Sequence, residues 1–362
     1  MKPILAILTE AIRFDNQAAL KFFRQFSVIH FYKSAPYHDL SAKDLQGAIQ
    51  YQNTADLEAK LCRLKPDIIQ GAEPYGSRNQ LKLCSVAWRV SRKLKIPLIF
   101  PMLENRPVNR RFGILGPILR KILYIYAQQA KIIFYLNEGA KRNLLDAGVN
   151  PKKLKRLLYG IWGIDTSIFK PINTPLRGRG ENKVRSILFV GRIDEAKGID
   201  YLLQAWEQIY QDFPQIELLF AGSGPLVWKV KKSQNKRVRY LGQIATQELP
   251  KIYSGALITC YPSVTLERWE EQVGMVNLQS LSCGTPVITT KSGAIPEYIN
   301  DKVGILIPER DASALARAMR KLLEDEKLRA RLGPAGREYI LKNFGAQRTI
   351  QKTEEILLGL LR

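Results

Sequence analysis

The chain has 362 residues, of which 46% are hydrophobic, and a formal net charge of +23. This length exceeds that of one typical domain, so we expect two domains, and the hydrophobic fraction excludes an intrinsically disordered chain. No apolar run reaches the roughly 18 residues of a membrane-crossing helix. The apolar run at residues 3–8 indicates a buried strand rather than a secretory leader. Four cysteines in apolar contexts, without a Cys-x-x-Cys pair, predict buried, reduced thiols in a cytoplasmic protein: Cys62, Cys84, Cys260 and Cys283.

The positive charge is concentrated in the first half of the chain. Residues 1–172 contain 28 Lys and Arg against 12 Asp and Glu, a net of +16, whereas the remainder has 28 against 21, a net of +7. A basic surface suits nucleic acid, an anionic membrane or a polyanionic substrate. Because no nucleic-acid reader motif is present, we expect no nucleic-acid partner.

Residues 109–129 carry part of this charge at helical spacing. They combine Arg110, Arg111, Arg120 and Lys121 with isoleucine, leucine and tyrosine. This pattern predicts either a helix that lies on an anionic membrane surface or a packed helix with a solvated basic face.

Short apolar runs alternate with helical patterns in the first 170 residues. The pattern predicts strands at residues 3–8, 26–31, 67–70, 96–100 and 131–136, and helices at 16–24, 55–64, 81–95 and 139–147. Two of these strands are almost wholly apolar, as expected for strands covered on both sheet faces. The alternation predicts an α/β domain at residues 1–170 with a mostly parallel, doubly wound, Rossmann-like sheet.

A second α/β series follows a stretch rich in proline, glycine and charge. Residues 171–184 predict a linker, because apolar periodicity lapses there. Beyond it, the pattern predicts strands at 185–190, 216–221, 238–241, 257–261, 287–290 and 304–307, and helices at 198–212, 273–282, 312–324, 327–343 and 346–361. We expect the second domain to span residues 185–345, with a ligand cleft between the two doubly wound domains.

Two strand ends in the second series carry residues suited to a phosphate ligand. In FVGRIDEAKG, Gly191 ends a strand, and Arg192 and Lys197 lie in the loop before the next helix. An arginine fork and a lysine on one such turn suit a diphosphate, although basic loop residues are more often solvated. In FAGSGP, Gly222 and Gly224 would let a ligand approach the backbone, but an ordinary tight turn explains them equally well.

A third strand end is the most informative stretch, YPSVTLERWEEQVGMVNLQSLSCGTP at residues 261–286. A strand leads into a Pro-Ser turn, an acidic segment and a helix, where the free amides of Gly274, Met275 and Val276 would point toward a phosphate or sugar oxygen. Glu271 would accept hydrogen bonds from sugar hydroxyls, and Gln279 would bond a ribose. In isolation, the simpler interpretation is that the acids only complement the helix dipole.

Together with the later TKSGAIPEYI, these motifs resemble the donor-binding half of retaining GT-B glycosyltransferases, the large glycosyltransferase family 4. That family carries a GR…KG loop, a GxGP turn, a P-S…E-x7-E segment and a GG-x-x-E loop. The resemblance is strong over residues 186–343 and extends loosely to LNEGAKRNLLDAGV and YGIWGIDTSIFKP in the first half. It implies a GT-B fold in which a C-terminal helix, residues 346–362, crosses back to the first domain.

The resemblance also implies roles for individual residues. Arg192 and Lys197 would hold the diphosphate of a nucleotide-diphosphate sugar and offset the charge of the leaving group, and Glu271 would hold the donor sugar. Such enzymes need no metal ion and no cofactor, which fits the lack of a DxD site or histidine cluster in this sequence. The remaining donor contacts would come from loops near the base and the sugar: Gln243, Ile244, Gly293 and Ala294.

Two departures from the family pattern concern reacting groups. The second acid of the E-x7-E segment is Gln279, an amide that still bonds a hydroxyl but predicts weaker or altered nucleotide binding. The histidine that many members carry after the fourth strand is missing, and neither His30 nor His38 is placed there. Glu104, in the corresponding loop, would accept a hydrogen bond or act as general base; the alternative is a solvated loop acid.

The sequence therefore predicts a metal-independent, retaining hexosyltransferase that moves a sugar from a nucleotide-diphosphate sugar to a glycan or lipid-linked acceptor. The basic first half favours a cytoplasmic protein, peripheral at the inner face of the membrane, in surface-polysaccharide or glycolipid synthesis. The alternatives are a sugar phosphorylase or nucleotide-sugar epimerase of the same fold, or a non-catalytic nucleotide-sugar-binding protein.

Overall fold

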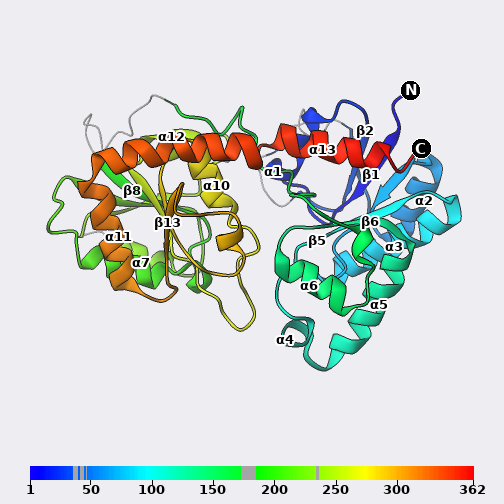
Figure 1. Ribbon diagram of the computed structural model, residues 1–362, viewed down its shortest axis with the longest axis horizontal. Helices are drawn as coiled ribbons and strands as arrows, with labels where there is room; N and C mark the ends of the chain where they lie inside the picture. Colours follow the sequence, from blue (N-terminus) through cyan, green and yellow to red (C-terminus); the bar gives the residue numbers. More distant parts are fainter. Residues whose placement is uncertain (36–39, 41–44, 46, 173–184, 234–235) are drawn as a thin grey trace. The chain divides into compact units, whose positions relative to one another are not determined.

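The computed structural model describes residues 1–35, 40, 45, 47–172, 185–233 and 236–362 (Figure 1). The chain forms two compact units. Unit 1 comprises Met1–Gly163 together with Ala346–Arg362, and unit 2 comprises Ile164–Gly345. Most of the expected linker, residues 173–184, lies outside the described residues, as does His38.

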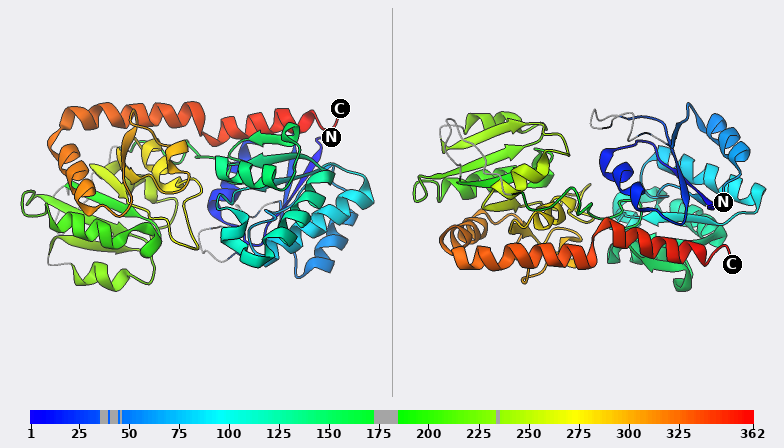
Figure 2. Two further views of the ribbon diagram at one scale, coloured as in Figure 1. Left: turned by 60° about the horizontal axis from the view of Figure 1, so that its bottom comes forward. Right: turned by 90° about the horizontal axis from the view of Figure 1, so that it is seen from above.

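Unit 1 is a seven-stranded parallel sheet with helices on both faces (Figures 1 and 2). Its order is β3-β2-β1-β4-β5-β6-β7, with strands β1 (Ile4–Leu8), β2 (Ser27–Tyr32), β3 (Ala48–Gln50), β4 (Ile68–Gln70), β5 (Leu98–Met102), β6 (Ala130–Tyr135) and β7 (Leu154–Arg156). Its described helices are α1 (Phe14–Gln17), α2 (Thr54–Leu64), α3 (Arg78–Leu94), α4 (Val108–Phe112), α5 (Gly116–Gln129), α6 (Glu138–Asp146) and α13 (Ala346–Leu358), with 3-10 turns η1 (Ala18–Phe22), η2 (Gly113–Leu115) and η3 (Pro151–Lys153).

Helix α13 packs on the sheet of unit 1. Ile350 and Leu357 are buried in a core cluster with Phe23 and residues of β1 and β6. The Glu354 Oε1 atom accepts hydrogen bonds from three successive backbone N–H groups, of residues 24–26, at 2.5 to 3.2 Å. Apolar burial and this buried carboxylate together attach the last helix of the chain to unit 1.

Unit 2 is a six-stranded parallel sheet of order β10-β9-β8-β11-β12-β13. The strands are β8 (Arg185–Val190), β9 (Ile216–Ala221), β10 (Val238–Gly242), β11 (Ile258–Tyr261), β12 (Val287–Thr290) and β13 (Gly304–Ile307). The described helices are α7 (Ile199–Glu207), α8 (Val227–Lys232), α9 (Leu249–Gly255), α10 (Met275–Ser282), α11 (Ala312–Glu324) and α12 (Glu326–Asn343), with 3-10 turns η4 (Glu195–Lys197) and η6 (Ile295–Glu297). The two doubly wound α/β sheets predicted from the sequence are confirmed.

Three local differences from the predicted elements have physical causes. The segment predicted as a helix at 16–24 is a single α-turn followed by a 3-10 turn, and it begins early because Asn16 Oδ1 accepts the Arg13 N–H at 3.0 Å. Helix α7 ends at Glu207 rather than 212, because the chain turns to bury Ile209 and Phe213 before Pro214. Strands β3 and β7 were not predicted, since each is a three-residue edge strand without an apolar run.

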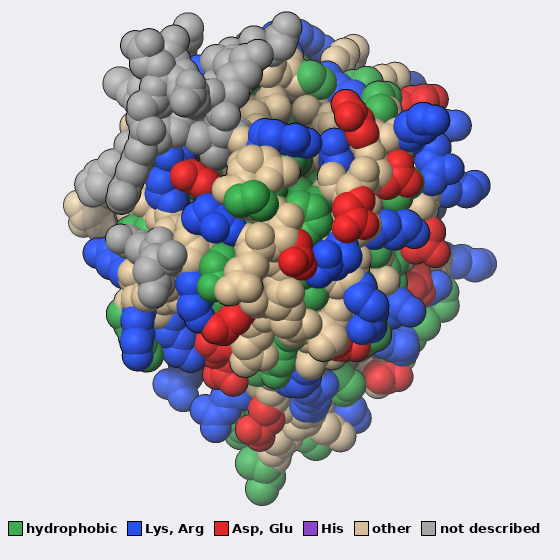
Figure 3. All heavy atoms as spheres, turned by 90° about the vertical axis from the view of Figure 1, so that its left-hand side faces the viewer, with side chains coloured by type: hydrophobic (Ala, Val, Ile, Leu, Met, Phe, Trp, Pro, Cys, Tyr) green, Lys and Arg blue, Asp and Glu red, His purple; other side chains and the backbone are tan. Residues whose placement is uncertain are grey.

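Charges of both signs are mixed on the side of the chain that Figure 3 shows. Lys and Arg side chains are interspersed there with Asp and Glu.

Three of the four cysteines are buried. Burial raises the pKa of the Cys84 and Cys260 thiols above their ordinary value; Cys283 is buried as well, and Cys62 is only partly covered. Within the described part of the chain, no helix combines the length and apolarity needed to cross a bilayer.

Candidate functional site

The loops expected to bind a donor leave one edge of the unit 2 sheet. Because the strands are parallel, the carboxyl ends of β8 to β12 meet at that edge. Strand β8 lies between β9 and β11, so the loops after β8 and β11 diverge from neighbouring strand ends. Such a topological switch point is where open α/β sheets bind their ligands.

Lys197 and Glu271, which come from separate motifs, meet at this switch point. Lys197 follows β8 in the turn η4, and Glu271 lies in the loop after β11. The Lys197 Nζ atom is 2.5 Å from Glu271 Oε1, which also accepts a hydrogen bond from Ser263 Oγ at 3.0 Å. With exposed side-chain fractions of 24% and 10%, both side chains are largely packed, and that of Lys197 retains some exposure to solvent.

An aromatic ring covers the same ammonium group. Lys197 Nζ lies 4.3 Å from the ring centroid of Trp269, a cation–π contact. The sequence pattern did not single out Trp269 or Ser263; their only signal was a position between the end of β11 and the helix α10. The resulting arrangement is a lysine held by a carboxylate and an indole, at which an anionic ligand would compete with Glu271 for the ammonium.

Arg192 lies in the same loop but is not part of this cluster. Its side chain is 70% exposed, and its Nε atom pairs with Asp194 Oδ2 at 2.7 Å. The other oxygen of Asp194 accepts the Lys197 backbone N–H at 3.1 Å, which caps the turn η4. One carboxylate therefore shapes the loop that carries both predicted cations.

Gly222 allows two of these loops to pack backbone against backbone. It has a φ of +136°, and a Cβ atom there would lie 1.9 Å from the carbonyl oxygen of Gly191. The Gly222 N–H also donates to the Gly242 carbonyl at 2.8 Å. Gly224 has the same relation to Ile193, at 2.3 Å. Both glycines are thus required by loop packing, whatever ligand approaches them.

Gly293 brings the loop after β12 against the backbone of Glu271. A Cβ atom there would lie 2.2 Å from the Glu271 carbonyl oxygen, and the Ala294 N–H donates to the same oxygen at 2.8 Å. The residue has a φ of +51°. These contacts fix the position from which the Glu271 side chain reaches Lys197.

Replacing Gly293 by alanine should therefore destabilise unit 2 and displace Glu271. We expect a loss of roughly 2 kcal/mol or more in the free energy of unfolding, because backbone atoms are in the way. Gly242→Ala is the matched control: its φ is also positive, at +79°, but no atom lies within 4 Å of the added methyl group. It should cost only about 1 kcal/mol. Urea denaturation of both variants makes the comparison, and equal losses would show that the Glu271 contact is unimportant.

Helix α10 begins beside these loops. Gly274 is its N-cap, with a φ of +75°, and Met275 and Val276 open the helix. The Gln279 Oε1 atom accepts a hydrogen bond from the buried Tyr253 hydroxyl at 3.0 Å. The carbonyl of this amide is therefore engaged within unit 2, which leaves its Nε2 group for a ligand. In the loop after β10, Gln243 is exposed and Ile244 is partly buried.

In unit 1, Glu104 is neither solvated nor free. Its carboxylate is 2% exposed and accepts hydrogen bonds from Arg106 Nε at 2.8 Å and Nη2 at 2.9 Å, and from the Arg106 backbone N–H at 3.0 Å. Arg111 Nη1 pairs with the same group at 2.8 Å. The interpretation of Glu104 as a solvated loop acid is wrong, and its partners favour a role in holding the loop after β5.

Glu73 supports the same loop, although no sequence motif pointed to it. Its Oε1 atom accepts the backbone N–H groups of Leu103 and Glu104 at 2.7 and 2.6 Å. Burial raises the pKa of Glu73 from 4.5 to about 7, although the two N–H groups oppose this shift. Two acids thus fix the loop at the carboxyl end of β5, one through backbone amides and one through arginines.

The raised pKa of Glu73 predicts a pH dependence of stability. Between pH 4.5 and about 7 the unfolded carboxyl has lost its proton while the folded one retains it, so the free energy of unfolding should fall as the pH rises. The fall attributable to Glu73 is roughly 3 kcal/mol. Glu73→Gln keeps an acceptor for the amides and should remove this component. Urea denaturation of both proteins from pH 5 to pH 8 measures this component. If the difference in the free energy of unfolding between the wild type and Glu73→Gln is the same at every pH, Glu73 is not its source.

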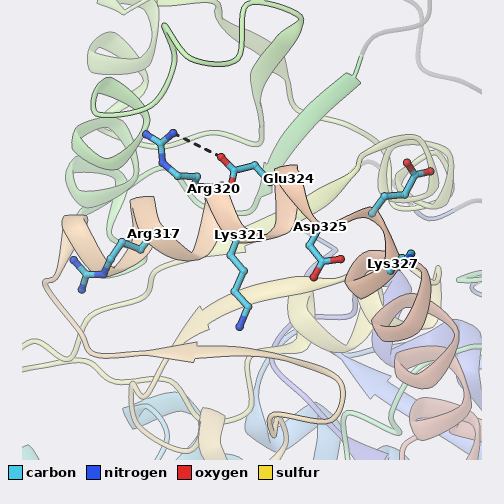
Figure 4. Close-up of a pocket in the computed structure, with 7 residues that line it drawn as sticks. Arg317, Arg320, Lys321, Glu324, Asp325 and Lys327 are labelled. Atoms are coloured by element: carbon cyan, nitrogen blue, oxygen red, sulfur yellow. Dashed lines mark ion pairs between the residues drawn. The ribbon is translucent and has the colours of Figure 1, made fainter.

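A charged hollow of about 670 Å³ lies elsewhere on unit 2, on the last turns of α11 and the start of α12 (Figure 4). Arg320 points toward Glu324 in Figure 4 and also pairs with Asp212 at 2.6 Å, while Lys321 points the other way. A helix that follows a parallel strand runs back toward the strands' amino ends, so its last turns lie at the edge opposite Lys197. We assign this hollow to the solvated surface; its lining residues are Arg317, Arg320, Lys321, Glu324, Asp325, Glu326 and Lys327.

Comparison with known protein families gives a match within unit 2. Residues 177–339 match the family model for glycosyl transferases group 1. Sulfoquinovosyl transferase SQD2 of Arabidopsis thaliana is 25% identical over 296 residues, which cover 77% of this chain and 54% of that protein. A GDP-mannose-dependent alpha-(1-6)-phosphatidylinositol monomannoside mannosyltransferase of Mycolicibacterium smegmatis is 26% identical over 257 residues, 67% of this chain and 66% of that protein. The chain therefore spans between about half and two thirds of the length of these relatives.

A solved structure extends the likeness to both units. Alr3699/HepE of Anabaena, in complex with UDP, has a TM-score of 0.76 at 17% identity, with 99% of this chain and 100% of that chain covered. At this identity the likeness concerns the fold, which is the GT-B fold of two Rossmann-like units. The family match covers residues 177–339, which lie within unit 2, so it is this unit that matches the group 1 glycosyl transferases.

Proposed function

We propose that this chain is a retaining glycosyltransferase that moves a sugar from a nucleotide-diphosphate sugar to a glycan or lipid-linked acceptor. The observation that carries the proposal is the contact between Lys197 and Glu271 at the switch point of the unit 2 sheet. A cation for phosphate and a carboxylate for sugar hydroxyls stand side by side where such sheets bind ligands. The donor would bind mainly to unit 2 and the acceptor to unit 1.

In this mechanism Lys197 leaves Glu271 for the donor diphosphate. The exposed Arg192 swings in from Asp194 to the second phosphate, and the amides of Gly274 to Val276 at the start of α10 add further donors. These positive groups stabilise the charge that develops on the leaving nucleoside diphosphate. Glu271, released from the ion pair, accepts hydrogen bonds from the donor sugar, and the acceptor hydroxyl arrives on the face that the leaving group vacates.

The remaining donor contacts follow from the loops at the same edge. Gln243 and Ile244 would read the base, Gln279 Nε2 would bond the ribose, and Gly293 with Ala294 would lie beside the sugar. We propose that cations of the chain take the place of a metal ion. Among the described residues no group of three His, Cys, Asp or Glu is arranged to hold one.

The setting proposed for the reaction is the cytoplasmic face of a membrane, in surface-polysaccharide or glycolipid synthesis. The net charge of +16 over residues 1–172 supports an anionic or lipid-linked acceptor. The name of one relative includes a phosphatidylinositol monomannoside, which supports a lipid-linked acceptor.

A panel of nucleotide sugars tests the proposal. Purified chain is screened for a shift in melting temperature with each donor, and donors that bind are then incubated with lipid-linked and glycan acceptors. Release of nucleoside diphosphate that requires an acceptor supports a transferase. Release that requires inorganic phosphate would indicate a phosphorylase, and acceptor-free conversion of the sugar an epimerase. Donor binding without turnover would favour the non-catalytic alternative, which the amide at Gln279 raises.

A further inference from the structure

Exposed large hydrophobic side chains gather in one segment of unit 1. Ten are exposed among the described residues, and half of them lie within residues 114–125. Ile114 is 93% exposed and Ile118 59%. Single exposed hydrophobic residues are ordinary, whereas a cluster marks contact with an apolar partner. The cluster consists of Ile114, Leu115, Ile118, Tyr124 and Ile125.

Helix α5 is apolar on two opposite faces. Leu123 and Ala127 are buried in the core of unit 1. Ile118 and Ile125 lie on the opposite face and are exposed, and Tyr124 is exposed on the flank between the two faces. A helix with one face in the core normally presents polar residues on the opposite face, so exposed isoleucines on the outer face of α5 indicate contact with an apolar partner.

The turn between α4 and α5 places the most exposed residues at a projecting tip. In Figure 1 the turn lies at the outer end of these two helices, away from the strands of unit 1. Gly113 starts the turn with a φ of +54°, and no atom lies within 4 Å of the position of its absent Cβ. Arg120 Nη2 donates to Asn109 Oδ1 at 3.1 Å, which holds α4 and α5 together at the turn. The tip is therefore convex and structurally defined.

Charge identifies the partner of this surface. Residues 105–137 contain six Lys and Arg and no Asp or Glu. Lys121 is exposed, and its spacing puts it in one row with Ile118 and Ile125. Arg111 is occupied inside the unit by Glu104 and by the carbonyls of Tyr75 and Gly76. Apolar side chains at a convex tip, with lysine beside them and no acid in the segment, match an anionic bilayer surface, where lysine stems extend to the headgroups.

We propose that unit 1 docks on an anionic lipid bilayer through the α4–α5 tip and the outer face of α5. Ile114 and Leu115 enter the boundary between headgroups and acyl chains, Ile118 and Ile125 lie along it, and Lys121 contacts lipid phosphates. The proposal uses none of the donor-site residues, so it stands or falls independently of the proposed reaction.

Flotation of the full chain with lipid vesicles tests this docking. Vesicles of phosphatidylcholine alone are compared with vesicles that also contain phosphatidylglycerol, and binding should favour the anionic ones. Ile118→Ser should lower the ratio of bound to free protein about ten-fold, and so should Ile114→Ser. Lys121→Glu should lower it by a similar factor on anionic vesicles only. Leu341→Ser and Lys321→Glu, at exposed positions of unit 2, are the matched controls and should bind like the wild type.

Circular dichroism of each variant establishes that it is folded before flotation. Failure of the wild type to float with any vesicle would overturn the proposal. So would variants of the tip that bind as well as the two controls. Sedimentation without lipid tests whether a second copy of the chain binds this surface instead of a bilayer. A wild-type dimer that Ile118→Ser converts to a monomer would assign the surface to that second copy and overturn the proposal.

Discussion

Replacing Lys197 by alanine is expected to lower the rate of sugar transfer at least about hundred-fold, because one preorganised donor to the leaving diphosphate is lost. Glu271 at 2.5 Å and the ring of Trp269 at 4.3 Å hold the ammonium beside the proposed diphosphate position, so it needs only to move from Glu271 to the bound donor. Lys197→Arg keeps the charge and should retain part of the activity. Arg192→Ala should act in the same direction, since Arg192 lies in the same loop.

Lys236 supplies the matched control for Lys197. It is also a partly exposed lysine of unit 2 paired with a glutamate, Glu207, but it precedes β10 and thus lies toward the amino ends of the strands. Lys236→Ala should leave transfer nearly unchanged. Initial rates of nucleoside diphosphate release, with the best donor from the panel, provide the measurement. Full activity in Lys197→Ala would remove the diphosphate assignment.

Replacing Glu104 by alanine is expected to destabilise unit 1 by about 3–5 kcal/mol, because a buried arginine loses its partner. The Arg106 side chain is only 8% exposed and makes two hydrogen bonds to the Glu104 carboxylate. Activity should fall in proportion to the folded fraction, since the carboxylate is engaged in the loop. Glu104→Gln, which keeps the shape and one acceptor oxygen, should lose less stability.

A surface ion pair provides the comparison for Glu104. Glu58 pairs with Arg89 at 2.8 Å, and their side chains are 29% and 46% exposed. Glu58→Ala should cost less than about 1 kcal/mol. Thermal and urea denaturation followed by circular dichroism, combined with turnover at a temperature where all variants are folded, separate the two effects. A Glu104→Ala protein of wild-type stability with much lower turnover would restore the catalytic role first assigned to it.

The two α/β sheets could be predicted from the sequence because apolar strand runs alternate with segments of helical periodicity along the chain. Strands β8, β9, β12 and β13 have the predicted bounds. The short edge strands β3 and β7 escaped because edge strands need no continuous apolar run.

The charged residues of the site were predictable because each lies in a motif that follows a predicted strand. Lys197 and Glu271 are 74 residues apart, and the parallel sheet brings their strand ends together, so motif and topology sufficed. The packing around them was not predictable. The contact of Trp269 with Lys197 and the use of the Gln279 carbonyl by Tyr253 depend on how loops fold back, which no periodicity encodes. The burial of Glu104 depends likewise on a loop that turns its own arginine inward.

Calorimetric titration of the full chain with nucleoside diphosphates such as UDP and GDP tests whether the edge of the unit 2 sheet at β8 and β11 binds a diphosphate through Lys197. We expect saturable binding of at least one nucleoside diphosphate by the wild type and by Lys236→Ala, with affinity at least about ten-fold lower in Lys197→Ala. Equal affinity in Lys197→Ala and the wild type, or no binding of any nucleoside diphosphate, would contradict this assignment.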